Sequence, residues 1–176
     1  VRVELEYTEI QAHRGGMGLW PENTIMAMKN AIDLGVDMLE LDLMISKDSL
    51  VVVSHEEIMS SEYVTKPDGT RVTKAEEASL VLFGMPYDDI RRYDTGLAGD
   101  SRYPARVRIA ACKPLLSELL DATEAHIREK GGRNLRYNIE IKASKGKEQR
   151  CMAPDYKTFT DLCMAVILEK GLGGRV

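Results

Sequence analysis

The sequence predicts an α/β fold in which parallel βα units form part of a barrel. Short apolar segments alternate with segments of helical periodicity along much of the 176 residues, a pattern typical of a parallel sheet covered by helices. Two of the expected strands also carry acidic side chains on one face and leucine or isoleucine on the other. Strands of open doubly wound sheets are apolar on both faces, whereas a barrel can hold a polar site at the carboxyl ends of its strands.

The first expected unit is a strand and a helix near the N-terminus. A short strand within Glu9 to Gly16 ends at a Gly-Gly loop. Asn23 or Thr24 is a suitable helix N-cap, and apolar residues follow at helical spacing. Gly35 is a natural stop for this helix.

Two further strands are expected before residue 57. The segment from Val36 to Met44 places three leucines on one face and Glu40 and Asp42 on the other, because successive side chains of a strand point in opposite directions. A turn signal at residues 47–49 separates it from Leu50 to Ser54, a valine-rich third strand.

The segment from Glu57 to Lys113 contains no long periodic helix. Pro67-Asp68-Gly69 lies between two runs rich in Thr and Val, which predicts a hairpin. Four of the seven tyrosines occur here, and we expect them to meet the substrate. We predict one barrel domain over residues 1–176, with residues 57–113 as an inserted subdomain after the third strand.

Regular structure is expected again after Pro114. A helix should run from there to Gly131, followed by a fourth strand from Tyr137 to Lys142. A helix from Asp155 to Lys170 carries an apolar stripe at the spacing of a buried helix face. Its stripe consists of Phe159, Leu162, Cys163, Val166 and Ile167. Arg175 and Val176 are expected to begin a further strand.

Composition excludes several classes of protein. The 24 basic and 28 acidic residues give a net charge of −4, which argues against binding to nucleic acid. No run of about 18 apolar residues is present, so no transmembrane helix is expected. The three cysteines lack CxxC spacing, which favours neither a disulfide framework nor a zinc site. The chain begins with Val1, from which we infer a cut or processed N-terminus; the compartment is left open.

The candidate site residues lie at the ends of the expected strands. Glu40 and Asp42 share a strand face, where they bind a hard divalent cation or are two unrelated solvated acids. Glu140 and Lys142 add a carboxylate and an ammonium on the fourth strand, as further site groups or as an ion pair inside the barrel.

Two histidines follow expected strands. His13 and Arg14 come after the first strand and His55 after the third. Two histidines at corresponding strand ends suggest an acid/base pair, and the guanidinium of Arg14 suits a phosphate. His126 lies within an expected helix and is interpreted as structural or surface-exposed.

These residues belong to an ordered set of motifs, through which the chain resembles the glycerophosphodiester phosphodiesterase family. The matching segments are His13-Arg14-Gly15, Pro21-Glu22-Asn23-Thr24, Glu40-Leu41-Asp42, Ser46-Lys47-Asp48, Val52-Val53-Ser54-His55 and Glu140-Ile141-Lys142. The resemblance implies a TIM-type (β/α) barrel with an insertion, represented here by about its first four βα units. It implies one divalent cation, Mg²⁺ or Ca²⁺, held by Glu40, Asp42 and Glu140. It also implies His13 and His55 as general acid and base, and Arg14 and Lys142 as ligands of the substrate phosphate.

The resemblance implies hydrolysis of a small-molecule glycerophosphodiester to glycerol phosphate and an alcohol. Alternatives are a phospholipase D-like or inositol-phosphodiester-type enzyme on the same fold, or a truncated, non-catalytic fragment that binds metal or phosphate. Glu56 departs from the family, which usually has Asp after the second histidine. The family barrel has eight strands and this chain supplies four expected ones, so we expect open sheet edges and possible self-association through them.

Overall fold

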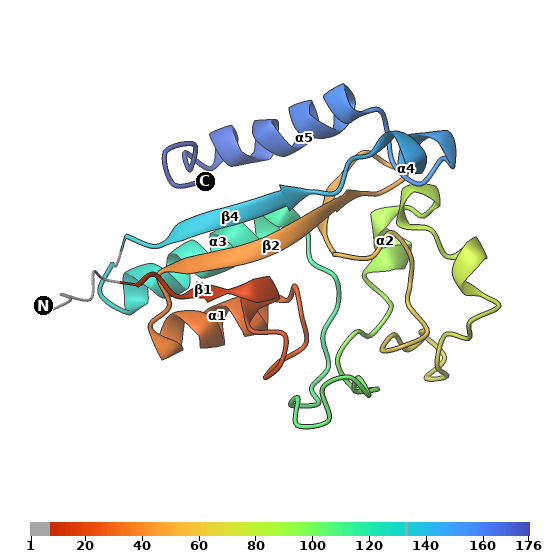
Figure 1. Cartoon of the computed structure of the whole chain (residues 1–176), viewed down its shortest axis with the longest axis horizontal. Helices are drawn as coiled ribbons and strands as arrows, with labels where there is room; N and C mark the ends of the chain where they lie inside the picture. Colours follow the sequence, from red (N-terminus) through yellow and green to blue (C-terminus); the bar gives the residue numbers. More distant parts are fainter. Residues whose placement is uncertain (1–7, 133) are drawn as a thin grey trace, which may run out of the picture.

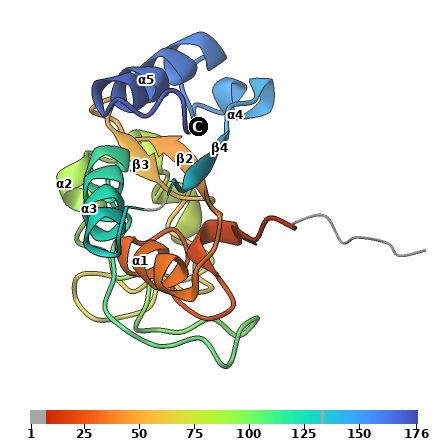
Figure 2. The same ribbon diagram turned by 90° about the vertical axis from the view of Figure 1, so that its left-hand side faces the viewer.

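The computed structural model describes residues 8–132 and 134–176, so Val1 lies outside the described residues. A single sheet forms its centre, and helices lie along one side of that sheet (Figures 1 and 2). The strands are β1 (Gln11–Ala12), β2 (Met38–Ile45), β3 (Val51–Val53) and β4 (Arg136–Ile141). The α-helices are α1 (Ile25–Leu34), α2 (Tyr87–Ile90), α3 (Leu116–Glu129), α4 (Lys145–Gln149) and α5 (Tyr156–Glu169). Three short 3₁₀ turns cover His13–Gly15, Glu77–Ser79 and Leu82–Gly84.

The central strand is β2, and it pairs in parallel with β1 on one side and with β4 on the other. In the register of β2 and β4, Glu40 lies beside Asn138 and Asp42 beside Glu140. The parallel pairing and the βα connections confirm the expected fold class. They also bring the carboxyl ends of β2 and β4 to the same edge of the sheet.

The third strand differs from the expected parallel unit, because β3 is antiparallel to β2. The five residues from Ser46 to Leu50 form a tight turn in which the Ser46 N–H donates to the Leu50 carbonyl at 3.0 Å. A parallel crossover needs roughly a dozen residues or more, so this connection can only reverse the chain. The apolar Val51–Val53 run shows burial but not strand direction, and the signal for the reversal is the short turn that precedes it.

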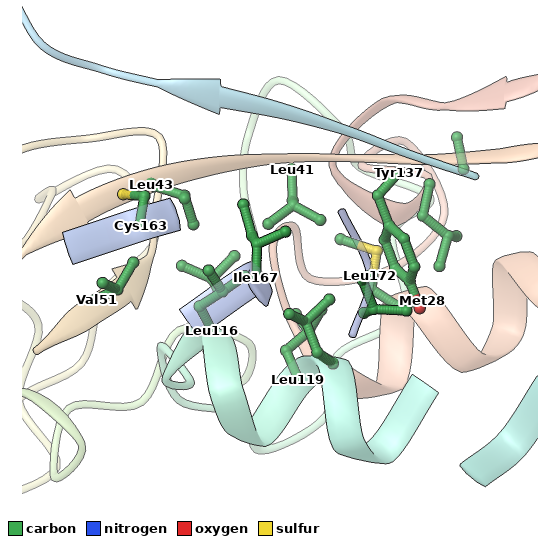
Figure 3. Packing of buried hydrophobic residues seen from close by; sticks show 14 of the residues in the cluster. Met28, Leu41, Leu43, Val51, Leu116, Leu119, Tyr137, Cys163, Ile167 and Leu172 are labelled. Carbon is green, nitrogen blue, oxygen red and sulfur yellow. The ribbon is translucent and has the colours of Figure 1, made fainter. Parts of the chain in front are cut away.

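Alternation along β2 separates a core face from a site face. Leu39, Leu41 and Leu43 are fully buried toward the helices, whereas Glu40 and Asp42 point to the opposite face. Figure 3 shows Leu41 and Leu43 above side chains of α3 and α5. Burying each leucine contributes about 1.5–3 kcal/mol relative to exposure. This packing holds β2 in one register and therefore fixes where the acidic side chains lie.

The expected stripe of α5 forms part of this core. Phe159, Cys163 and Ile167 are buried, and Leu162 and Val166 pack against them. Asp155 is the N-cap of α5, and its carboxylate accepts hydrogen bonds from the backbone N–H groups of residues 157 and 158. Its buried face confirms the spacing argument made from the sequence.

Thr24 is the N-cap of the N-terminal helix α1, and its hydroxyl oxygen accepts a hydrogen bond from the Ala27 N–H at 3.2 Å. Gly35 follows the helix with φ of 85°, as a left-handed stop residue should. Thr24 rather than Asn23 is the N-cap, which leaves the Asn23 side chain available for contacts elsewhere.

The segment between β3 and α3 packs around a second apolar cluster, in which Met59, Val64, Leu82 and Ile90 meet Met44 of β2 and Val52 of β3. It contains only short helical turns, and residues 65 and 71 pair across the predicted hairpin. Tyr63 and Tyr87 are buried in this cluster. The expectation that the tyrosines meet substrate is therefore wrong for these two, because their rings complete a core.

The C-terminal residues approach the free side of β4. Arg175 is not assigned to a strand, but its carbonyl accepts a hydrogen bond from the Tyr137 N–H at 2.8 Å. Among the helices of the described residues, none combines the length and apolar character needed to span a bilayer.

Candidate active site

Three carboxylates converge at the carboxyl edge of the sheet. Glu40 and Asp42 come from β2 and Glu140 from β4, and one oxygen of each lies within 4.8 Å of the others. Parallel pairing of β2 with β4 produces this cluster, because it places Asp42 directly beside Glu140. Glu40 and Asp42 are buried, whereas 57% of the Glu140 side chain is exposed. The cluster is thus shielded from solvent at β2 and accessible to solvent at Glu140 of β4.

The electrostatics of this cluster fit a divalent cation. Burial, with a further contribution from neighbouring Asp42, raises the pKa of Glu40 above its ordinary value. Oδ1 of Asp42 is buried, and the Lys142 ammonium lies 3.1 Å from it. A bound cation would further relieve the repulsion among the three carboxylates. Carboxylate oxygens are the ligands that Mg²⁺ and Ca²⁺ prefer.

Lys142 lies against the same cluster. Its Nζ is 2.7 Å from a Glu140 oxygen and 3.1 Å from Oδ1 of Asp42. Although burial disfavours its charge, these two carboxylates raise the pKa of Lys142 above its ordinary value. The structure therefore places a charged ammonium between two of the three candidate ligands.

Arg14 is fixed beneath the cluster by several acidic partners. Its backbone N–H donates to Glu40 at 2.6 Å, and its φ of 52° is in the left-handed region. The guanidinium pairs with Glu22 at 2.9 Å and lies 3.3 Å from Asp42. Only 11% of the side chain is exposed, so these carboxylates fix the orientation of the guanidinium.

His13 stands at the open side of the same loop. Nε2 of His13 is 3.9 Å from Oε2 of Glu40, and 59% of the side chain is exposed. The imidazole is therefore accessible from solvent while it remains next to a candidate metal ligand.

His55 returns to the same edge because β3 reverses the chain. The N–H of the preceding Ser54 donates to the Asp42 carbonyl at 2.8 Å. Nδ1 of His55 is 3.0 Å from the Glu56 carboxylate, and this hydrogen bond is the main cause that lowers the pKa of Glu56. The longer side chain of Glu56 thus reaches the imidazole, and the pair leaves Nε2 of His55 for other partners.

His126 lies away from these groups on α3. Its Nε2 is 2.9 Å from Asp33 of α1, and 13% of the side chain is exposed. This contact joins two helices, which matches a structural role for the third histidine.

Three residues at the site were not singled out as site residues in the sequence. Asn23 has φ of 56°; its amide donates to Asp42 at 2.9 Å and its oxygen accepts from the Asp42 N–H. Arg106 pairs with the carboxylate of Glu22 that also binds Arg14. Lys113 donates to Ser54 at 2.8 Å. Asn23 lies in a motif that was quoted, and Lys113 begins Lys113-Pro114-Leu115-Leu116, which also resembles a family landmark. Arg106 comes from the irregular segment, where no periodicity indicates it.

The fold and the site define a barrel-type α/β protein with a carboxylate cluster and two histidines at the carboxyl edge of its sheet. The model of the glycerophosphoryl diester phosphodiesterase family matches residues 13–165. The chain therefore belongs to this family, as the resemblance of the sequence motifs predicted.

Relatives and solved structures agree with this assignment. The chain is 32% identical over 136 residues to a glycerophosphodiester phosphodiesterase of Caldanaerobacter subterraneus, covering 77% of this chain and 46% of the relative. It is 56% identical over 46 residues to a human lysophospholipase D, covering 26% of this chain and 15% of the relative. A family structure from Silicibacter pomeroyi superposes with a TM-score of 0.82 at 23% identity, over 99% of this chain and 57% of that one. The chain thus spans about half the length of the relatives and structures that it matches most fully.

Proposed function

We propose that this protein takes part in the metal-dependent hydrolysis of glycerophosphodiesters to glycerol phosphate and an alcohol. The observation that carries the proposal is the convergence of Glu40, Asp42 and Glu140 within 4.8 Å at the carboxyl edge of the sheet. That edge is where barrel enzymes carry their active sites. Family membership and the names of the relatives support the substrate class.

The proposed cofactor is one Mg²⁺ or Ca²⁺ ion, held by Glu40, Asp42 and Glu140. Such an ion supplies positive charge that stabilises the phosphoryl oxygens as negative charge develops on them. The convergence of three carboxylates and the raised pKa of Glu40 support the presence of a cation here.

His13 and His55 are the proposed proton carriers. Glu56 binds Nδ1 of His55, which stabilises the imidazolium form, so His55 is suited to take a proton from the attacking oxygen. His13 is more exposed and is the proposed acid that protonates the leaving alcohol. Neither role requires the histidine to be buried or bound to the cation.

Arg14 and Lys142 are the proposed ligands of the substrate phosphate. Both cations already adjoin Asp42, so a phosphate bound over the carboxylate cluster would lie near two fixed positive charges. Their carboxylate partners orient them before substrate arrives, which lowers the cost of organising the site.

We further propose that residues 57–113 act as a subdomain inserted into the barrel after β3. They pack around an apolar cluster that they share with Met44 of β2 and Val52 of β3, and they supply Arg106 and Lys113 to the site. Such an insertion is suited to shape the part of the pocket that receives the alcohol group.

A second candidate function is cleavage of lysophospholipids on the same site. The 56% identity over 46 residues with a human lysophospholipase D supports it. The reaction would break the same kind of phosphodiester bond, but the substrate would carry an acyl chain. Product analysis with glycerophosphocholine and with lysophosphatidylcholine distinguishes the two, because only cleavage of lysophosphatidylcholine releases an acylated glycerol phosphate.

The test of the proposed function is release of glycerol phosphate from glycerophosphocholine in the presence of Mg²⁺ or Ca²⁺. We expect chelation to abolish the activity and either ion to restore it. Glu40→Gln combined with Asp42→Asn should abolish both activity and ion binding, the latter measured by calorimetry.

Asp161→Asn is a matched control, because Asp161 is exposed on α5 and pairs only with Lys157 on its own helix. It should leave ion binding and activity unchanged. Full activity after exhaustive chelation, or in the double variant, would contradict the proposed metal site.

A further inference from the structure

Lys113 is a buried lysine at the end of the inserted segment. Only 5% of the residue is exposed. Its Nζ donates to Oγ of Ser54 at 2.8 Å, lies 3.5 Å from the Tyr63 hydroxyl, and sits 5.5 Å from the centre of the Tyr63 ring. In the part of the chain that the structure describes, no carboxylate lies within 4 Å of this ammonium. A buried charge without an ion-pair partner is costly, so its retention calls for an explanation other than stability.

The partner of Lys113 belongs to the turn that carries His55. Because the Ser54 hydroxyl donates its one hydrogen to the Glu56 carbonyl at 2.7 Å, it accepts from the Lys113 ammonium. The Glu56 carboxylate in turn binds Nδ1 of His55 at 3.0 Å. Lys113 is therefore connected to His55 through Ser54 and Glu56: the Ser54 bond ends on the carbonyl of Glu56 and the His55 bond on its carboxylate.

The backbone around Lys113 is fixed against β3. The Val53 N–H donates to the Pro114 carbonyl at 2.8 Å, and Leu115 pairs with Val52. The ammonium consequently approaches the 54–56 turn from a rigid support rather than from a mobile loop.

The charges that surround Lys113 come from several elements. Glu22, Asp42 and Glu56 favour the ammonium, whereas Arg14 opposes it. Burial is the larger effect and lowers the pKa of Lys113 to about 8. The lysine is therefore mostly charged at pH 7 and loses its charge as the pH rises through this value.

We propose that Lys113 is a positioning residue for the His55–Glu56 pair: its ammonium fixes the Ser54–Glu56 turn so that His55 faces the substrate. The proposal rests on the proposed function only for its activity readout. The neutral amine formed above about pH 8 holds the turn less firmly, so the proton-transfer step weakens there.

The test compares Lys113→Met, Lys113→Arg and Ser54→Ala with the unmodified protein. Misplacing a catalytic group by about 1 Å costs on the order of 100-fold in rate, so Lys113→Met should lower kcat by about 10- to 100-fold with little change in KM. Ser54→Ala should have an effect of similar size. Lys113→Arg keeps the charge, so it should retain more activity and extend it above pH 8.

Thermal unfolding separates this role from a structural one. The ordinary pKa of lysine is 10.5, so between pH 8 and 10.5 the unfolded chain binds a proton that the native chain does not. The free energy of unfolding should therefore rise with pH in that window. Lys113→Met lacks the buried charge and should have a Tm at pH 7 no lower than that of the unmodified protein.

A readout independent of activity is the ring signal of His55 in protein labelled with ¹⁵N-histidine. We expect an inflection near pH 8 in the unmodified protein and none in Lys113→Met, while the signal of His126 shows none in either. Lys74→Met is the matched control: Lys74 is exposed and pairs with Glu77 within the inserted segment, so activity and the His55 signal should not change.

Three results would overturn the proposal: a kcat of Lys113→Met within twofold of the unmodified value, an unchanged His55 signal, or a large fall in Tm that Lys113→Arg fails to reverse. Absence of phosphodiesterase activity in the unmodified protein would contradict the proposed function instead, and the His55 signal would still decide the role of Lys113.

Discussion

At the scale of single residues, specific hydrogen-bond and ion-pair partners orient Asp42 and Arg14. Asn23 binds both the carboxylate and the N–H of Asp42, and Arg14 contacts both Glu22 and Asp42. Asn23 and Arg14 both have positive φ, a conformation that costs of order 1–3 kcal/mol when it is imposed on a residue other than glycine. The hydrogen bonds and ion pairs around them offset that cost, so the site is organised before any substrate binds.

The histidine pair makes the clearest prediction at this scale. His13→Ala and His55→Ala should each lower kcat by at least about 100-fold, because each removes a proton carrier. Ion affinity measured by calorimetry should change far less. The kcat of Glu56→Gln should lie between those of these variants and that of the unmodified protein, since this change weakens the hydrogen bond to Nδ1 of His55 but keeps the imidazole.

His126→Ala is the control for these variants. It removes contacts with Asp33 of α1 and with Glu129 of its own helix, both away from the candidate site, so the rate should be nearly unchanged. A large effect of His126→Ala together with a normal rate for His55→Ala would show that the pair has been wrongly assigned.

At the scale of elements, two connections bring candidate catalytic side chains to the sheet edge. The β1–α1 loop holds His13 and Arg14 against β2, and the antiparallel β3 returns His55 to Asp42. The first loop packs tightly on α1: a Cβ on Gly15 would lie 2.9 Å from the Cβ of Ala27, at a φ of +76°. Only glycine fits both the conformation and the space.

Gly15→Ala should therefore damage the site as well as the fold. The combined steric and conformational cost should lower the free energy of unfolding by about 1–3 kcal/mol, as measured by urea denaturation. Activity should fall with it, because His13 and Arg14 immediately precede Gly15. Gly69→Ala is the matched control, because the φ of Gly69 is +84° but nothing lies within 4 Å of the added Cβ. We expect a smaller decrease in the free energy of unfolding and no effect on activity.

At the scale of the whole molecule, the sheet has open sides. In the described ranges 8–132 and 134–176, β1 and β4 each pair with β2 as their only strand partner. Unpaired strand edges promote association between chains, and Ile10, at the β1 edge, is 60% exposed. An eight-stranded barrel has no such edges.

We therefore expect the 176-residue chain to self-associate in a concentration-dependent manner, as measured by static light scattering. Ile10→Lys should reduce the association, because a charge at a strand edge opposes pairing. Leu168→Lys changes an equally exposed residue on α5, outside the strands, and should not alter it. A monomer at all concentrations would contradict this prediction.

The sequence alone determined the fold class, the core faces and the residue types of the site. Alternation in β2 and β4 separates leucine and isoleucine from carboxylates, and side-chain direction in a strand depends only on local geometry. The helical stripe of α5 was equally clear, because helical periodicity is also local. Family motifs singled out His13, Glu40, Asp42, His55 and Glu140 as candidate site residues without any knowledge of distances.

Only the tertiary structure decided how these parts meet. The bond from Asn23 to Asp42 and the arrival of Arg106 and Lys113 from the inserted segment depend on contacts between residues far apart in the chain. An irregular segment carries no period from which such contacts could be predicted. The burial of Lys113 likewise results from Ser54, Tyr63 and the surrounding chain packing around it, because the environment of a side chain belongs to the folded molecule and not to the residue.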